Sequence, residues 1–398
     1  MKKICPILFA SIAVLLCLLS CETFEPVALD DSALLDGPVA DLSAAEHIQF
    51  LKGDASFNNQ VFNSSNGLGP LFVSTSCGSC HPGDGKGHPF TTLTRFGQIN
   101  ETGNQFLKSG GPQLQHRSVP GFTPEQIPAD ATFSKFTPPA NTGLGFLDAV
   151  SDSDILLFAD PNDLNGDGIS GVPNWIELKE YVMPRDGSVV QNGKYIGRFG
   201  KKAATYNLLQ QTAQAYNQDI GITSTFEPTD TYSGVEIDPE ISNQEIQDVV
   251  FYLKTLKAPI PRQANTDVLT GKQLFLNVGC GGCHRPEMKT AITTIQSLSN
   301  KVFYPYTDLL LHDMGSGLDD GYTEGSAKTS EWRTPPLWGL GLSKNSQGGE
   351  YFLLHDGRAK SIEEAIRLHG GEGTKSKESF ESLPAGEKKK LISFLESL

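Results

Sequence analysis

The pattern Cys-x-x-Cys-His occurs twice, at residues 77–81 (Cys-Gly-Ser-Cys-His) and at residues 280–284 (Cys-Gly-Gly-Cys-His). In this pattern the two thiols add across the vinyl groups of a haem and hold the porphyrin covalently, and the histidine supplies the fifth iron ligand. The spacing is tight because all three bonds come from one helical turn. The sequence therefore predicts two covalently bound haem c groups, held by Cys77, Cys80 and His81 and by Cys280, Cys283 and His284.

A structural zinc site is the alternative explanation for two Cys-x-x-Cys pairs. The histidine directly after each second cysteine argues against zinc, and zinc folds usually have a shorter spacing between their pairs. An export signal on the chain also favours haem, because c-type haem is attached after export.

The N-terminus has the features of this export signal. Lys2 and Lys3 precede an apolar run that ends at Leu19 and is too short to span a membrane. Residues 18–21 (Leu-Leu-Ser-Cys) resemble a bacterial lipobox, which implies cleavage before Cys21 and a lipid on its sulfur. Ordinary signal cleavage near the same place is the alternative. We therefore expect a cell-envelope protein, anchored to a membrane by the lipid on Cys21 and facing the periplasm or lying at the outer membrane.

Cysteine usage and charge limit the other functions. Of seven cysteines, two lie in the leader, one is Cys21 and four belong to the haem motifs, so none is left for disulfides or thiol redox chemistry. The full chain has a formal charge of −14, and loss of residues 1–20 removes two lysines and no acid, which gives −16. Such a charge disfavours nucleic acid as a partner. It favours a basic or neutral redox partner, although simple solubility is the more ordinary explanation of such a charge.

Two parts of the chain resemble each other at both ends. Leu71-Phe72 and Leu274-Phe275 each precede a haem motif at the same distance, where a cytochrome c fold has the helix that leads into the motif. Segments 249–256 and 391–398 share the apolar pattern of an amphipathic helix. We therefore predict a mainly α fold with two cytochrome c-like domains.

The domain boundaries follow from composition. We predict a signal peptide at 1–20, a tether at 21–42, an N-terminal domain at 43–258 and a C-terminal domain at 265–398. The linker between the domains contains Pro259 and Pro261. The N-terminal domain has a loop-rich insertion at about 87–241, which is rich in Gly, Pro and Asn.

A calcium-like loop lies inside this insertion. Asp163, Asn165 and Asp167 stand at positions 1, 3 and 5, with Gly168 at position 6, as at the start of a calcium-binding loop. Position 12 is Asn174 instead of a bidentate glutamate, so coordination would be weaker or completed from elsewhere. An Asx turn without metal explains the same residues.

Several further motifs carry a family resemblance. They are 307–315 (Thr-Asp-Leu-Leu-Leu-His-Asp-Met-Gly), 331–339 (Glu-Trp-Arg-Thr-Pro-Pro-Leu-Trp-Gly), 355–358 (His-Asp-Gly-Arg), 363–372 (Glu-Glu-Ala-Ile-Arg-Leu-His-Gly-Gly-Glu), 166–171 (Gly-Asp-Gly-Ile-Ser-Gly) and 197–200 (Gly-Arg-Phe-Gly). Together these motifs resemble the bacterial di-haem oxidoreductase family, whose members are described as peroxidases and sometimes as thiol oxidoreductases. The family is similar in its haem halves to di-haem cytochrome c peroxidases and to the di-haem enzyme that matures methylamine dehydrogenase.

The resemblance implies a ligand for the second haem. In the related enzymes a residue after a segment like 355–358 is the sixth iron ligand, and it is Met, or Tyr in the maturation enzyme. The matching position is His369, so the resemblance implies ligation by His284 and His369 and a lower reduction potential than that of a His/Met haem. The alternatives are a histidine that only caps its helix, or ligation by His312 or Met314.

The resemblance also suggests neighbours of the haems. Arg333 and Arg358 are candidates for pairing with haem propionates or for holding the two domains together, and a surface ion pair is the alternative. His355 is expected to support the site without binding iron. Trp332 and Trp338 are expected to pack in the core or at a haem edge, and an electron relay is the alternative.

The distal side of haem 1 has three candidates, which are His88, His116 and an open site. His88 is only seven residues after His81 and fits a surface or propionate contact. His116 lies in segment 110–117 (Gly-Gly-Pro-Gln-Leu-Gln-His-Arg), a loop expected near a pocket. The catalytic loop of the related peroxidases has no clear match, so the catalytic candidates are the iron on His81 and His116.

We therefore expect an exported di-haem c-type cytochrome oxidoreductase that transfers electrons and has a peroxidase-like reaction at haem 1. Its partner would be a redox protein or a small oxidant such as peroxide. One alternative is a pure electron-transfer cytochrome with both haems six-coordinate. The other is a non-catalytic envelope lipoprotein that is accessory to iron or haem handling.

Overall fold

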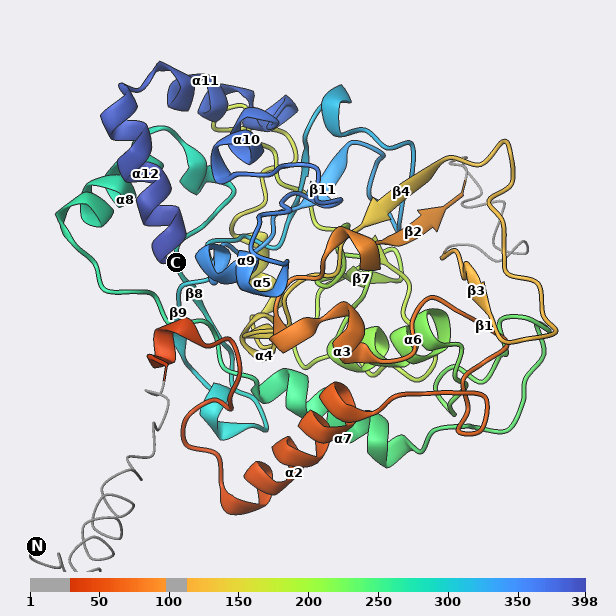
Figure 1. The fold of residues 1–398 in the computed structure, drawn as a ribbon. Coiled ribbons are helices and arrows are strands. Elements are labelled where there is room, and N and C mark those ends of the chain that lie inside the picture. Colours follow the sequence, from red (N-terminus) through yellow and green to blue (C-terminus); the bar gives the residue numbers. More distant parts are fainter. Residues whose placement is uncertain (1–28, 98–112) are drawn as a thin grey trace, which may run out of the picture.

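The computed structural model describes residues 29–97 and 113–398 (Figure 1). The predicted signal peptide at 1–20 and the predicted lipid-bearing Cys21 lie outside these residues, as does part of the predicted tether. Helices account for 35% and strands for 12% of the structure, in agreement with the predicted mainly α fold. None of the helices in the described ranges has the length and apolar character that a membrane span requires.

The helices are short, and the longest have 13 residues. In chain order they are α2 (Ala44–Asp54), α3 (Cys77–Cys80), α4 (Leu144–Asp148), α5 (Asp152–Leu156), α6 (Leu208–Ile220), α7 (Asn243–Thr255), α8 (Thr266–Asn277), α9 (Ser343–Ser346), α10 (Ile362–Arg367), α11 (Thr374–Ser382) and α12 (Ala385–Ser397).

The strands form small antiparallel sheets, paired as β1–β3, β2–β4, β5–β7–β6, β8–β9 and β10–β11. They are β1 (Leu71–Phe72), β2 (Leu93–Phe96), β3 (Arg117–Ser118), β4 (Phe133–Phe136), β5 (Trp175–Ile176), β6 (Val190–Gln191), β7 (Lys194–Ile196), β8 (Met288–Lys289), β9 (Val302–Phe303), β10 (Leu311–Asp313) and β11 (Glu331–Arg333).

Two pairs of crossing helices organise the molecule, and both depend on a glycine. In the first pair, α2 packs on α7, and a Cβ atom on Gly53 would collide with the backbone oxygen of Asp248. In the second pair, α8 packs on α12, and a Cβ atom on Gly271 would collide with the backbone oxygen of Lys390. The two halves therefore repeat one close helix crossing, which the two amphipathic segments of the sequence only suggested.

The entry into the haem motif differs between the halves. Leu274 and Phe275 lie on α8, as expected. Leu71 and Phe72 do not lie on a helix, because they form β1 and pair with β3. The helical stretch before the first motif ends at Asn59, and the loop that follows contains glycines and a proline, which break a helix. The predicted helix at Leu71–Phe72 is therefore wrong.

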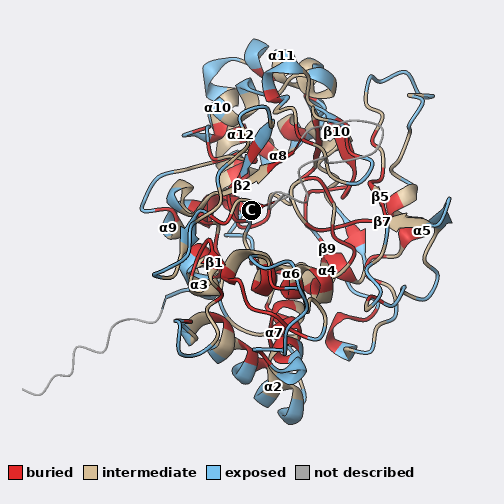
Figure 2. Cartoon of the chain, turned by 90° about the vertical axis from the view of Figure 1, so that its right-hand side faces the viewer, coloured by how far each residue is buried: buried red, intermediate tan, exposed pale blue. Residues whose placement is uncertain are grey.

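The hydrophobic core has two main clusters that are not cleanly divided along the sequence. One cluster joins α2, α6 and α7 but also includes Phe303, Leu310 and Trp338 from the C-terminal part. The other joins α8, α10, α11 and α12. Figure 2 shows the buried residues where the helices face each other and the exposed ones on the outer faces of α2 and α11. The domain boundaries at 258 and 265 stay a prediction.

Candidate functional site

Both Cys-x-x-Cys-His motifs line one cavity of about 740 Å³. A volume of this order is typical of cofactor pockets in proteins. The wall also includes residues of α6, of the 331–340 segment and of the 362–377 segment. The tertiary structure therefore brings together the two haem motifs and most of the family motifs that are dispersed in the sequence.

The first motif forms the short helix α3, whose N-terminal residue is Cys77. Ser76 caps this helix by accepting a hydrogen bond from the backbone of Ser79. The next residue, His81, has its Nδ1 atom 2.9 Å from the carbonyl oxygen of Pro139. Burial lowers the pKa of His81 to about 4, so the ring is neutral. With Nδ1–H donating to a carbonyl, the Nε2 lone pair is available to a metal.

The second motif repeats this geometry with different residues. His284 has its Nδ1 atom 3.0 Å from the carbonyl oxygen of Tyr306, and burial lowers its pKa to about 4. Burial also raises the pKa of the Cys77 and Cys280 thiols to about 12, which makes both poor thiolate nucleophiles. A carbonyl that fixes each imidazole tautomer is the usual support of a metal-binding histidine.

Four cations line this cavity without an ion-pair partner in the described part of the chain: Lys86, Lys201, Arg333 and Lys377. Burial lowers the pKa of Lys86 to about 8 and that of Arg333 to about 10. Burial, together with repulsion from Lys86 and Arg333, lowers the pKa of Lys201 far more. Uncompensated buried charge is costly. Because a haem carries two propionates, these residues fit haem groups bound in the cavity.

Lys201→Met is expected to lower the reduction potential of the nearest haem in the loaded protein. Removing a lysine whose ammonium form the propionates would stabilise disfavours the more negative reduced state, by on the order of tens of millivolts for a charge several ångströms away. A spectroelectrochemical titration measures this shift. Lys52→Met, which removes an exposed lysine on α2, is the control and should leave both potentials unchanged. Equal potentials in Lys201→Met and the wild type would contradict propionate pairing by Lys201.

Arg358 does not line the cavity. Its Nε atom lies 2.6 Å from Asp356 and its side chain reaches Asp320 at 3.5 Å, so carboxylates of the chain already balance its charge. Asp320 also binds His355 Nε2 at 2.8 Å, and the His355 ring stacks on Trp332 with centroids 3.7 Å apart. The structure therefore places Arg358 in a network with Asp320 and His355 beside Trp332, whereas Arg333 lines the cavity.

His369 follows α10 and lines the cavity together with His284. Its Nδ1 atom lies 2.7 Å from the carbonyl oxygen of Ala365. Because this hydrogen bond uses Nδ1, the Nε2 atom is available to a metal, as in the two motif histidines. A Cβ atom on Gly373 would lie 3.0 Å from His369 Cβ and 3.4 Å from Met314 Cε, so Met314 is close by. The structure brings His369 and Met314, two of the three candidate ligands of haem 2, to the same region.

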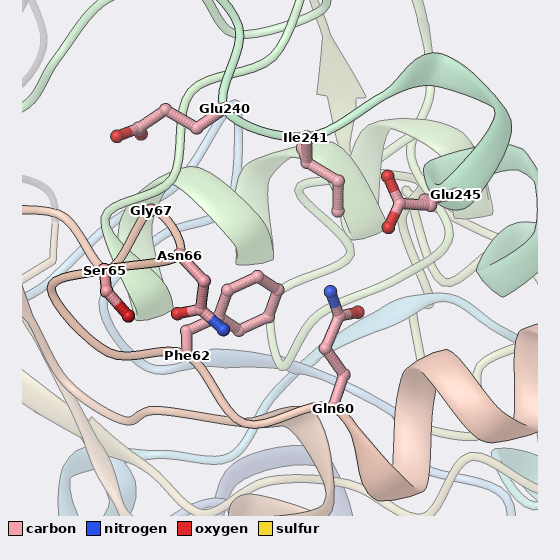
Figure 3. Close-up of a pocket in the computed structure, with 8 residues that line it drawn as sticks. All are labelled: Gln60, Phe62, Ser65, Asn66, Gly67, Glu240, Ile241 and Glu245. Atoms are coloured by element: carbon pink, nitrogen blue, oxygen red, sulfur yellow. The ribbon is translucent and has the colours of Figure 1, made fainter.

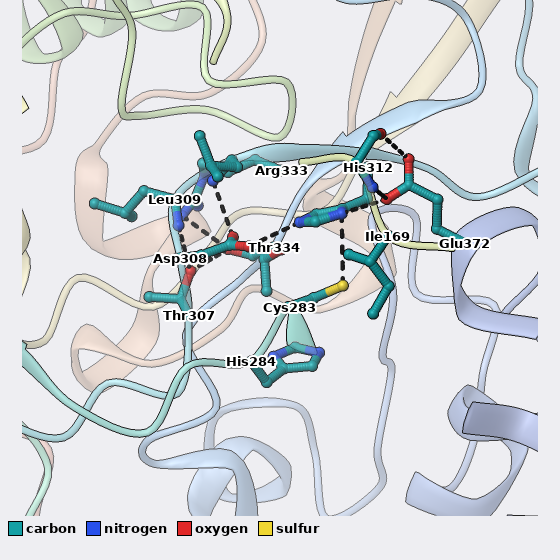
Figure 4. Close-up of polar contacts among 12 residues, drawn as sticks. Ile169, Cys283, His284, Thr307, Asp308, Leu309, His312, Arg333, Thr334 and Glu372 are labelled. Carbon is teal, nitrogen blue, oxygen red and sulfur yellow. Dashed lines mark hydrogen bonds and ion pairs between the residues drawn. The ribbon is translucent and has the colours of Figure 1, made fainter. Parts of the chain in front are cut away.

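His312, the other candidate ligand, is held by two carboxylates beside the second motif (Figure 4). Its Nε2 atom lies 2.8 Å from Asp308 and its Nδ1 atom 2.6 Å from Glu372, while Cys283 Sγ is 3.5 Å away. Burial alone would lower the pKa of His312, but the hydrogen bonds with Asp308, Cys283 and Glu372 raise it well above its usual value. Both ring nitrogens are occupied, so this side chain is poorly placed to bind iron.

The calcium-like loop lies against the second motif. Ile169 packs against Gly282, and Glu372 accepts a hydrogen bond from the backbone of Ser170 at 3.1 Å. Within the loop, Asp163 accepts from the backbone of Gly168 and Asp167 accepts from Ile169, at 3.1 and 2.8 Å. In the described ranges no group of three or more His, Cys, Asp or Glu side chains is arranged to hold a metal ion.

The structure does not bring the candidate histidines of haem 1 to His81. His116 is exposed and does not line the cavity, whereas Gln113, three residues earlier, does. His88 packs against Phe90 and Phe352, with ring centroids 4.5 and 4.7 Å apart. Neither histidine is therefore placed to be a distal ligand.

Sequence reasoning missed a polar network on the cavity wall. Arg95 on β2 pairs with Glu324 at 2.6 Å, and its guanidinium also donates to Gln113 and Gln218. Arg95 and Glu324 are 229 positions apart. No local pattern joins them, and only a comparison of many homologous sequences could have signalled their contact.

A second hollow, of about 540 Å³, lies away from both motifs, between α7 and the loop at 65–67 (Figure 3). Its two carboxylates serve local structure. Glu245 completes the N-terminal cap of α7 with Ser242, and Glu240 accepts from the backbone of Thr223 at 3.0 Å. This hollow contains no residue of the haem motifs.

The comparison with protein families matches residues 28–97 and 133–398 to a model described as "Di-haem oxidoreductase, putative peroxidase". The chain belongs to the di-haem oxidoreductase family. The matched residues contain both motifs of this di-haem oxidoreductase, and the unmatched stretch contains Gln113 and His116. The family assignment supports haem as the cofactor of the chain.

No curated protein matches this di-haem oxidoreductase. Two solved structures are similar over most of its length. One is the Kuenenia stuttgartiensis hydrazine synthase pressurised with xenon, with 14% identity, coverage of 95% of this chain and 97% of that chain, and a TM-score of 0.39. The other is a MauG-like protein associated with microbial copper homeostasis, with 13% identity, coverage of 92% and 93%, and a TM-score of 0.41.

Proposed function

We propose that this di-haem oxidoreductase is an exported c-type cytochrome with two covalently bound haems and a peroxidase-like reaction at haem 1. One observation carries the proposal. His81 and His284 face one cavity, and each has its Nδ1 atom bound to a backbone carbonyl and its cysteines beside it. We also propose that residues 43–258 and 265–398 are two cytochrome c-like domains, because each half has its own crossing helix pair.

The two haems are proposed to have different roles. His369 would complete the coordination of haem 2, which would then relay electrons, whereas no histidine candidate reaches the distal side of haem 1 in the described residues. Haem supplies the electron transfer and the chemistry with small oxidants. The chain would hold the two proximal imidazoles neutral, and the cations that line the cavity would pair with the haem propionates.

Low-temperature EPR of the oxidised, haem-loaded protein tests this assignment. We expect one high-spin and one low-spin ferric signal, because haem 1 would have an open face and haem 2 would have two histidine ligands. His369→Ala should convert the low-spin signal to high spin, whereas His88→Ala should leave the spectrum unchanged. Two low-spin signals in the wild type would instead indicate an electron-transfer cytochrome.

Calcium binding by the loop at 163–168 is tested by thermal unfolding. A loop that binds calcium should melt at a higher temperature with calcium than with a chelator, because a ligand that binds only the folded state stabilises it. Asp167→Asn should abolish that increase. A melting temperature that is the same with calcium and with the chelator would show that backbone hydrogen bonds alone hold the turn.

The cellular location and the redox partner of the protein are also part of the proposal. We propose that the protein is lipid-anchored through Cys21 in the cell envelope, with a redox protein or a small oxidant such as peroxide as its partner. The lipobox-like residues 18–21 support the anchor, and the formal charge of −14 favours a basic or neutral protein partner over nucleic acid.

A further inference from the structure

A buried lysine lies over a tryptophan of the cavity wall. Lys202 is 0% exposed, and its Nζ atom is 3.9 Å from the centre of the Trp332 ring. The ammonium group donates to the backbone oxygens of Lys328, Thr329 and Glu331, at 2.9, 3.1 and 2.7 Å. Burial lowers the pKa of Lys202 to about 8, so the amine stays protonated at neutral pH. Because all three N–H groups are used, the cation is held at a fixed position over the ring.

The other face of the Trp332 ring is covered by His355. The two rings are stacked, with centroids 3.7 Å apart and an angle of 9° between their planes, so Lys202 must lie on the opposite face. Burial lowers the pKa of His355, although the contact with Asp320 acts in the other direction. The imidazole is therefore neutral, and Lys202 supplies the positive charge beside the indole.

The indole N–H of Trp332 has no base to receive its proton. Its Nε1 atom donates to the backbone oxygen of Leu318 at 2.7 Å, and a backbone carbonyl does not take up a proton near neutral pH. One-electron oxidation of an indole gives a radical cation, which forms more easily when the N–H proton can leave. An oxidised Trp332 would have to keep both its proton and its positive charge beside the Lys202 ammonium. Both features therefore disfavour the oxidation of Trp332.

Trp332 lies close to the second haem motif. Strands β10 and β11 pair Trp332 with His312, and the side chains of directly opposite residues lie on the same face of a sheet. The Nδ1 atom of His312 is 3.5 Å from Cys283 Sγ, and Trp332 itself lines the shared cavity. Trp332 is therefore one side chain away from the attachment point of haem 2, where an oxidisable ring would compete for electrons.

We propose that Lys202 keeps Trp332 reduced, so that this tryptophan neither relays nor retains oxidising equivalents from the haems. The inference rests on the proposed haem loading and peroxidase-like reaction. Lys202 does not line the cavity, so it acts through its charge on Trp332. Without that charge, two electrons would leave the indole and, with two protons, reduce one peroxide to two waters. Water would supply the oxygen atom of the resulting hydroxytryptophan and release two protons.

Peptide mass spectrometry of the hydroxytryptophan yield tests this role. Trp338 is the internal reference, because it also lines the cavity and is 8% exposed against 7% for Trp332. In the described residues no cation lies over the Trp338 ring. Haem-loaded protein is treated with hydrogen peroxide or, separately, with light, tris(bipyridine)ruthenium and persulfate, which give a one-electron oxidant without a haem reaction. Lys202→Met should raise the yield at Trp332, relative to that at Trp338, about 10- to 100-fold.

Three further variants separate charge from structure. Lys202→Gln keeps two donors for the carbonyls and removes the charge, so it should give the same rise, whereas Lys202→Arg keeps the charge and should match the wild type. Lys360→Met is the matched control, because Lys360 Nζ lies 3.6 Å from the centre of the Phe352 ring, and its loss should change nothing at Trp332. Equal rises in Lys202→Met and Lys360→Met would overturn the inference. Equal yields at Trp332 and Trp338 in the wild type would overturn it as well.

The two oxidants separate this inference from the proposed function. If the ruthenium oxidant reveals the effect of Lys202 but peroxide is not consumed, the peroxidase-like reaction is overturned and the role of Lys202 stands. If the wild type consumes peroxide and is modified at Trp332 as much as at Trp338, the role of Lys202 alone is overturned.

Discussion

Replacing Cys280 and Cys283 with alanine should reduce the covalent haem content from two groups per chain to one. The two proposed thioether bonds of haem 2 would come only from these cysteines, and no other cysteine of the described residues lines that part of the cavity. The mass of the denatured protein should fall by one haem, because a haem held only by His284 is lost on unfolding. Absorbance of the pyridine haemochrome, per mole of protein, should halve.

The reciprocal variant is the control for this experiment. Replacing Cys77 and Cys80 with alanine should remove haem 1 and give the same change in mass. The EPR signal of the haem that remains should differ from the signal in the Cys280/Cys283 variant. The haem left by the Cys280/Cys283 variant should be high spin, and the haem left by the Cys77/Cys80 variant should be low spin. One zinc ion and no haem in the wild-type protein would contradict the prediction.

Arg198→Met should destabilise the folded protein by about 3–5 kcal/mol, the usual cost of breaking a buried ion pair by removing one partner. Arg198 and Asp152 form an ion pair whose side chains are 0% and 1% exposed. Arg198 also donates to the backbone oxygens of Leu147 and Asp148, at 3.2 and 2.9 Å. Methionine fills the space but leaves a buried carboxylate and two carbonyls without these donors. Urea unfolding followed by circular dichroism measures the change.

Arg367→Met is the matched control for Arg198. Arg367 pairs with Glu363 at 2.7 Å, but the two side chains are 54% and 38% exposed. An exposed pair of this kind contributes less than about 1 kcal/mol. The double variant Arg198→Met/Asp152→Asn should lose less than the sum of the single changes, because it leaves no unpaired buried charge. Similar losses in Arg198→Met and Arg367→Met would show that burial does not strengthen this pair.

Local patterns predicted two of the helices whose residues line the cavity. The apolar segment 249–256 lies almost entirely in α7 and the segment 391–398 in α12, because a buried helix face repeats every three or four residues and is visible in one short window. The Leu71-Phe72 pair shows the limit of this reasoning. The Leu71-Phe72 pair matches Leu274-Phe275 in sequence and in distance from the haem motif. However, a loop with glycines and a proline precedes it, and the pair forms a strand instead of a helix.

Side-chain partners were less predictable than elements. Arg333 and Arg358 looked equivalent in the sequence, yet Arg333 faces the cavity and Arg358 is balanced by Asp356 and Asp320. His312 and His369 were both candidate ligands, and the difference between them is that two carboxylates hold the first ring. Such outcomes depend on which charges lie within hydrogen-bonding distance, which a single sequence does not encode locally.

The sequence by itself determined the two haem motifs, because one helical turn is enough to place two thiols and an imidazole on one porphyrin. It also determined the helical character of the chain. Only the tertiary structure decided that both motifs open into one cavity, and that Arg95 meets Glu324 from the other half of the chain. The physical reason is the distance along the chain over which each kind of interaction acts. Attachment chemistry and helix formation act over a few residues, whereas cavities and buried ion pairs arise from contacts between segments that only folding brings together.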